Sequence, residues 1–127
     1  MKYEQATGRL LEDDGKVIGY GWAGHLQGRN NPAMQDVKGV GPLPKGKYTV
    51  GDPEDGTHLG PLAFPLTPDP ANEMFGRNAF FIHGASQEHP ALSSDGCIIQ
   101  GRLAREYVSI KIGATPKDDP CRQLIVV

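Results

Sequence analysis

The sequence has no long apolar run and almost no net charge. Its 127 residues contain no stretch near the roughly 20 apolar residues of a membrane-spanning helix. The first residues, MKYEQ, lack the apolar segment of a secretory signal peptide, which predicts folding in the cytoplasm and leaves open export by a route that ignores such signals. Thirteen basic and fifteen acidic residues give a net charge of −2, so no nucleic-acid partner is expected.

Cysteine is scarce, and the metal-binding residue types are poorly spaced. The two cysteines, Cys97 and Cys121, allow one disulfide at most. The four histidines and two cysteines show neither Cys-x-x-Cys nor His-x-x-x-His spacing. We therefore expect no structural metal site.

What the sequence does contain is typical of one turn-rich β domain over residues 1–127. It has 17 glycines and 11 prolines, with 38% hydrophobic and 22% charged residues. Residues 23–40 are polar and rich in glycine and asparagine, and an ordered loop of this length in a small domain is more often functional than not.

Short apolar runs between turn signals predict six or seven strands and one short helix. Pro44 and Gly46 form a tight turn before one strand, and prolines place the run at 61–66 at a sheet edge. A hairpin joins the first two predicted strands. The expected strands are 2–11, 16–22, 47–50, 61–66, 79–82 and 122–127, and the helix is 100–110. We expect a mainly β fold, either a β-sandwich or a barrel.

A histidine and a cysteine each stand next to an apolar run. His83 follows one, and Cys97 follows Gly96 in the segment SSDGCII at 93–99. A cysteine nucleophile needs a base, and a neighbouring imidazole supplies one. The N–H of Cys97, which Gly96 leaves accessible, is a candidate oxyanion donor, and the carbonyl of Gly84 is a candidate to orient the imidazole. Taken separately, a cysteine after glycine is usually a small buried side chain, and a histidine at a strand end usually only has its hydrogen bonds satisfied. Taken together, the two residues leave the structural and the functional interpretation open.

The sequence resembles L,D-transpeptidases of the YkuD fold, bacterial enzymes that remodel peptidoglycan, in its His-Gly pair followed by Ser-x-Gly-Cys-Ile. It is more similar still to the type VI secretion effector branch of that fold. Ahead of that pair of motifs, the shared segments are YxQxTGRL at 3–10, NNPAMQ at 30–35, VGPxPxGxY at 40–48 and NEMFGR at 72–77. The resemblance implies a YkuD-like β-sandwich or barrel with one or two short helices.

The resemblance also implies a cysteine peptidase that acts on peptidoglycan stem tetrapeptides without a metal or cofactor. Cys97 would attack the carbonyl between diaminopimelate and the terminal D-Ala, and His83 would take the thiol proton and later protonate the leaving amine. Gly84 would orient His83, while Gly96 and Cys97 would hold the oxyanion. Ser94 would shape the loop. Water would give L,D-carboxypeptidase activity, a D-amino acid would give exchange, and a neighbouring stem's amine would give a cross-link.

Two positions depart from the housekeeping members of the resembled fold. Those members carry His two residues before the cysteine, where this sequence has Asp95, and often Arg or Asn two residues after it, where this sequence has Ile99. Since the second change removes a group that binds carboxylate or amide, we expect substrate contacts from Arg77, Asn30 and Asn31. The Asp95 carboxylate would oppose formation of the thiolate, so we expect it to point outward or to bind a substrate ammonium group, such as the free amine of diaminopimelate.

The effector resemblance implies an antibacterial toxin that is made in the cytoplasm without a signal peptide. It would be exported by a type VI secretion apparatus, act in the target-cell periplasm and be neutralised by a cognate periplasmic immunity protein. Two alternatives remain: a housekeeping cell-wall L,D-transpeptidase, and a non-enzymatic β binding module closed by a Cys97–Cys121 disulfide. Sortases fit less well because this sequence lacks their Thr-Leu-x-Thr-Cys strand, and papain-like enzymes place Cys before His.

Overall fold

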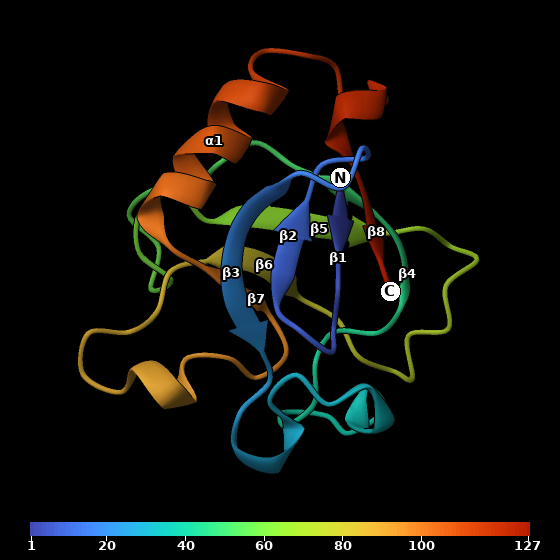
Figure 1. Ribbon diagram of the computed structural model, residues 1–127, viewed down its shortest axis with the longest axis vertical. Coiled ribbons are helices and arrows are strands. Elements are labelled where there is room, and N and C mark those ends of the chain that lie inside the picture. Colours follow the sequence, from blue (N-terminus) through green and yellow to red (C-terminus); the bar gives the residue numbers. More distant parts are fainter.

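Eight short strands close into a barrel, and one α-helix lies beside it (Figure 1). The computed structural model describes residues 1–127. The strands are β1 (Lys2–Tyr3), β2 (Arg9–Leu11), β3 (Val17–Ala23), β4 (Gly46–Val50), β5 (Phe64–Pro68), β6 (Phe80–His83), β7 (Ile98–Gln100) and β8 (Gln123–Val126). Their order around the barrel is β1-β2-β3-β7-β6-β5-β4-β8, closed by the pairing of β8 with β1. This is the barrel form of the predicted mainly β fold, with more strands than expected.

The first predicted strand is in fact two strands. Residues 2–11 form β1 and β2, which pair antiparallel because the chain reverses between them. In this turn the N–H of Gly8 donates to the carbonyl of Glu4 (2.9 Å), and the N–H of Glu4 donates to the carbonyl of Arg9 (3.0 Å). Gly8 has a φ of +75°, a conformation that glycine adopts without strain. The predicted hairpin with the run at 16–22 is present as β2 and β3.

The proline-containing strand β5 is an interior strand, and its predicted edge position is wrong. It begins at Phe64 and pairs with both β4 and β6. The carbonyl of Pro65 accepts from the N–H of Gly51 (2.8 Å), which places the missing N–H of Pro65 on the side of β4. Since β4 ends at Val50, the lost hydrogen bond falls at a strand end, where it disrupts no ladder.

The core is one cluster of 16 buried side chains to which every strand contributes. Alternation along the strands decides which side chains enter it, because successive residues of a strand point to opposite faces. Ile82 of β6 and Ile98 of β7 are fully buried in this cluster and lie side by side in the parallel β6–β7 pair. The residues that alternate with them therefore project from the outer face of the barrel.

The helix α1 (Arg102–Ile112) confirms the predicted helix, displaced by two residues toward the C-terminus. It buries Ala104, Val108 and Ile112, which recur every fourth residue and so share one face. Leu103, in contrast, is 82% exposed. In Figure 1 α1 lies beside β3, at the upper left of the barrel. No helix of the chain combines the length and the apolar character needed to cross a membrane.

Four short 3-10 helices occupy the loops. They are η1 (Leu26–Gly28), η2 (Pro32–Met34), η3 (Pro90–Leu92) and η4 (Pro120–Arg122). The long loop that holds η1 and η2 forms the lower end of the molecule in Figure 1. It contacts the segment before β7, because the N–H of Leu43 donates to the carbonyl of Gly96 (2.9 Å). The loop is thus attached to the segment that carries the candidate nucleophile.

Candidate active site

Cys97 and His83 lie on neighbouring strands. His83 is the last residue of β6, and Cys97 immediately precedes β7. These strands are parallel, with Ile82 beside Ile98, so the preceding residue of each strand places Cys97 beside Phe81. The N–H of Phe81 donates to the Cys97 sulfur (3.4 Å). Because residues two apart on a strand share a face, His83 and Cys97 project from the same outer face of the barrel.

The His83 ring is held in one orientation and is neutral near pH 7. Its Nδ1 lies 2.8 Å from the carbonyl oxygen of Gly84. A carbonyl only accepts hydrogen bonds, so Nδ1 carries the proton and Nε2 has the free lone pair of a base. The side chain is buried, and this burial lowers the pKa of His83 below its usual value. The nearby positive charge of Arg105 lowers it further, whereas the Gly84 contact opposes both effects.

The Cys97 thiol is free and protonated at rest. Burial raises its pKa to about 11, and the negative charge of Asp95 adds to this effect. The hydrogen bond from Phe81 and the positive charge of Arg77 act in the opposite direction. No hydrogen bond joins the sulfur to the His83 ring in this resting arrangement. The backbone N–H of Cys97 donates to no other residue's carbonyl, so it remains available to an oxyanion.

Ser94 organises the loop that carries the cysteine. Its buried hydroxyl donates to the carbonyl of Cys97 (2.6 Å) and accepts from the N–H groups of Gly24 (2.8 Å) and Gly96 (3.1 Å). The resemblance implies that Gly96 and Cys97 together hold the oxyanion. The structure corrects this point, because the N–H of Gly96 is already directed at Ser94 and only that of Cys97 is free.

Asp95 projects outward at the rim of the site. Its side chain is 83% exposed, and one carboxylate oxygen lies 3.7 Å from Nδ1 of His25. The same His25 nitrogen lies closer to the carbonyl of Ser94, at 2.8 Å. The carboxylate is therefore largely solvated and accessible to a positively charged group.

Arg77 is a structural clamp, and its predicted contact with substrate is not supported. The side chain is buried, and its two terminal nitrogens donate to four backbone carbonyls between 2.6 and 3.1 Å away. The acceptors are Gln35, Gly41, Pro42 and Asp95. Because all four terminal N–H groups have partners and only the Nε–H does not, this guanidinium has no terminal nitrogen left for a carboxylate. Its role is to join the long loop to the segment before Cys97.

Asn30 and Asn31 likewise form contacts within their own loop. Asn30 has a φ of +51°, and its side-chain oxygen accepts from the N–H of Ala23 (3.1 Å). Asn31 caps η2 by accepting from the N–H of Ala33 (3.1 Å) and donates to the carbonyl of Gln27 (3.0 Å). The predicted substrate role of these amides is therefore not supported, since both shape the backbone.

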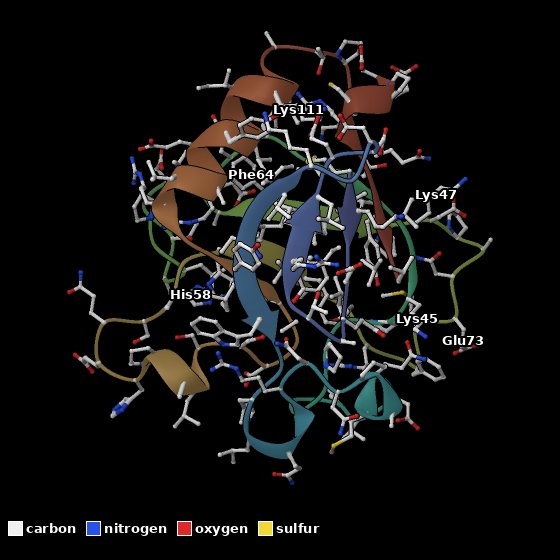
Figure 2. All side chains as sticks on the ribbon, in the orientation of Figure 1. Lys45, Lys47, His58, Phe64, Glu73 and Lys111 are labelled. Carbon is white, nitrogen blue, oxygen red and sulfur yellow. The ribbon has the colours of Figure 1, made fainter.

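A cleft of about 730 Å³ opens beside His83 on the outer surface. The loop before β5, which carries His58, forms one wall, and residues 84–88 form another. Arg105 of α1 and the exposed Asp95 complete the lining. Figure 2 shows His58 on the same side of the molecule as the loop that follows β6. The cleft thus contains a base, a cation and a carboxylate within one concave surface.

Arg105 is the residue of this cleft that the sequence analysis missed. It is only 8% exposed, its Nε donates to the carbonyl of Gln100 (3.0 Å), and its Nη1 donates to the carbonyl of Pro61 (2.7 Å). The sequence feature that could have identified Arg105 is its position in the predicted helix. It lies next to Ala104 and three residues before Val108, so it falls on the apolar face, where packing fixes the position of a charged side chain.

The two cysteines are both free, so the disulfide-closed alternative is wrong. Cys121 belongs to η4, where its sulfur lies 3.4 Å from the hydroxyl of Thr115. No three histidine, cysteine or acidic side chains gather in a geometry that could hold a metal ion.

Comparison with known proteins adds one finding. A family model described as the Tlde1 domain matches residues 18–113, a span that runs from β3 to the end of α1 and includes both His83 and Cys97. No curated protein and no solved structure matches the chain.

Proposed function

The chain belongs to the Tlde1-domain family of type VI secretion effectors, and we propose that it is a cysteine L,D-carboxypeptidase and L,D-transpeptidase of peptidoglycan. The observation that carries this proposal is the position of His83 and Cys97 on one outer face of two adjacent segments, with His83 Nδ1 held by the Gly84 carbonyl. A base oriented in this way beside a free thiol at an open cleft is the arrangement that acyl transfer requires.

In the first half-reaction Cys97 becomes acylated. A rotation about its Cα–Cβ bond turns the sulfur from the N–H of Phe81 toward the imidazole, as sites without substrate often require. His83 Nε2 takes the thiol proton while the sulfur attacks the carbonyl carbon of diaminopimelate. The backbone N–H of Cys97 stabilises the resulting oxyanion. The bond to D-Ala then breaks, and His83 returns the proton to the leaving amine.

In the second half-reaction the thioester is resolved. When water is the acceptor, His83 removes one of its protons, the carbon–sulfur bond breaks, and a tripeptide stem and the free thiol result. When the amine of a D-amino acid is the acceptor, the same steps exchange the terminal residue. Because thiol and imidazole are both neutral at rest, His83 must act as a general base at the moment of attack and not as part of a preformed ion pair.

The charges of the cleft support a zwitterionic substrate. The solvated Asp95 carboxylate, two residues before Cys97, is free to bind the side-chain ammonium group of diaminopimelate. Glu88, which also lines the cleft, adds a second negative charge. Peptidoglycan stem peptides carry both an ammonium group and carboxylates, so they match this distribution.

Membership of an effector family supports export by a type VI secretion apparatus, with action in the periplasm of the target cell. A toxin of this kind requires protection of the producing cell. We propose that a cognate periplasmic immunity protein covers the cleft beside Cys97. The housekeeping alternative is disfavoured because the matched family consists of secretion effectors.

The decisive experiment is mass spectrometry of muropeptides after incubation of purified sacculi with the protein. We expect the wild type to convert tetrapeptides to tripeptides and, when a D-amino acid is added, to incorporate it. Cys97→Ala should lower this rate by more than about a thousandfold, because it removes the nucleophile. Cys121→Ala is the matched control and should retain activity, since this sulfur belongs to η4 and lies against the hydroxyl of Thr115, not beside β6.

Unfolding curves of both variants should match that of the wild type to within about 1 kcal/mol, so that loss of activity reflects chemistry. Tetrapeptide trimming by Cys97→Ala at the wild-type rate would refute the mechanism.

A further inference from the structure

Arg105 is a buried cation with no anionic partner. It is 8% exposed, and its Nε and Nη1 donate to the backbone carbonyls of Gln100 and Pro61. Its Nη2 makes no hydrogen bond, and none of the molecule's ion pairs includes Arg105. A buried charge without a counter-ion is costly, so a guanidinium that is fixed in place with one nitrogen free is suited to receive an anion.

The free nitrogen lies next to the catalytic histidine. A Cβ added to Gly84 would stand 2.7 Å from Nη2 of Arg105, so the guanidinium packs where any other residue would have its side chain. Gly84 is also the residue whose carbonyl orients His83. Arg105 and His83 line the same cleft, in which no other arginine or lysine takes part.

We propose that Arg105 binds the terminal carboxylate of the D-amino acid on the leaving side of the scissile bond. The inference rests on the proposed peptidase function and specifies how that site recognises its substrate. The order in which Cys97, His83 and Arg105 lie along the site supports this assignment. Cys97 meets the scissile carbonyl, and His83 protonates the leaving amine. The carboxylate, one carbon beyond that amine, then falls on the far side of His83, where Arg105 lies against Gly84.

Arg105 would supply the carboxylate-binding group that the sequence lacks two residues after the cysteine. The housekeeping enzymes place a carboxylate- or amide-binding residue two positions after the cysteine, where this chain has the buried Ile99. Arg77 is excluded because its terminal N–H groups all have partners. The same subsite would hold the carboxylate of an incoming free D-amino acid, which explains how one cleft can serve both trimming and exchange.

The test is a binding measurement, so it does not depend on turnover. Isothermal titration calorimetry of the Cys97→Ala protein compares the tetrapeptide L-Ala-D-Glu-diaminopimelate-D-Ala with the same peptide amidated at its C-terminus. We expect the free acid to bind about ten- to a hundredfold more tightly, the range expected for a charge-assisted hydrogen bond to arginine. Equal affinity for acid and amide, or no measurable binding of the acid, overturns the proposal.

Further substitutions in the Cys97→Ala protein test whether Arg105 is responsible for the preference for the free acid over the amide. Arg105→Gln should bind acid and amide equally, and Arg105→Lys should retain part of the preference through its charge. Arg102→Gln, on the exposed side of the same helix, is the matched control and should discriminate as the parent does. Persistent discrimination in a folded Arg105→Gln protein refutes the assignment. If Arg105→Gln does not fold, the folded Arg105→Lys protein decides the assignment, and a preference as strong as that of the parent refutes it.

Failure of the proposed function would be seen separately, as absence of D-Ala release by the protein with Cys97 intact. That outcome leaves the comparison of acid and amide binding to decide the role of Arg105.

Discussion

Cys97 and His83 are both uncharged at rest near pH 7, for the same physical reason. Burial disfavours the charged form of each group, so it raises the pKa of the thiol to about 11 and lowers the pKa of the imidazole. A histidine and a cysteine that each adjoin an apolar run suggest a reactive thiolate, yet the burial of the two side chains favours the neutral form of both. A single residue's chemistry therefore depends on its solvation as much as on its neighbour.

This protonation state predicts slow alkylation of Cys97 at neutral pH. In a Cys121→Ala protein, the rate of reaction with iodoacetamide should rise about tenfold per pH unit from pH 7 toward 11, because only the thiolate reacts. Mass spectrometry of the labelled protein at fixed times measures this rate. A rate that is already at its plateau at pH 7 would contradict a raised pKa and favour a preformed thiolate.

At the scale of the elements, the site depends on how closely β3 approaches β7. Gly21 of β3 pairs with Gln100 of β7, and a side chain at Gly21 would overlap the carbonyl oxygen of Ile99. Because the obstacle is backbone, it cannot move aside as a flexible side chain can. β7, the strand that follows Cys97, can therefore pack this closely against β3 only because residue 21 is a glycine.

Gly21→Ala should accordingly destabilise the fold by about 3 kcal/mol or more, through separation of β3 from β7. Gly101→Ala is the matched control. Gly101 has open space around its Cα and a φ of −67°, so substitution should change stability by less than about 1 kcal/mol. Urea denaturation followed by tryptophan fluorescence measures both. A Gly21→Ala protein as stable as Gly101→Ala would show that the two strands can separate without penalty.

For the whole molecule, the buried Cys97 thiol makes the free energy of unfolding depend on pH in the alkaline range. The folded pKa of Cys97, about 11, lies above the unfolded value near 9, so the folded state retains its proton over that interval. This contribution is fully present below pH 9 and is lost as the pH rises toward 11. His83 affects stability on the acidic side of the pH range. Its lowered pKa makes the unfolded state the better proton acceptor, so stability declines as the pH falls below about 6.5.

Between pH 9 and 11 the wild type should lose up to about 3 kcal/mol of unfolding free energy relative to Cys97→Ala, which has no thiol to ionise. The comparison of the two proteins cancels the ionisation of tyrosines, which both contain. Urea denaturation at several pH values gives the difference directly. A constant difference across this interval would mean that the folded and unfolded thiols share one pKa.

Local sequence patterns determine several secondary-structure elements and the two candidate catalytic residues of this protein. The hairpin of β2 and β3 and the helix at 102–112 both follow from residues close together in the chain. His83 and Cys97 could be singled out for the same reason, since each adjoins an apolar strand. These are features that backbone preferences and hydrophobic periodicity encode over a few positions.

What only the tertiary structure decided concerns groups far apart in the sequence. Closure of the barrel made β5 an interior strand despite its prolines, because the missing donor falls where β4 ends. Four distant carbonyls turned Arg77 into a clamp, and the packing of α1 brought Arg105 against Gly84. These three-dimensional contacts decide which arginine has all its terminal N–H groups paired and which has a terminal nitrogen free for an anion. No local pattern of residues encodes them.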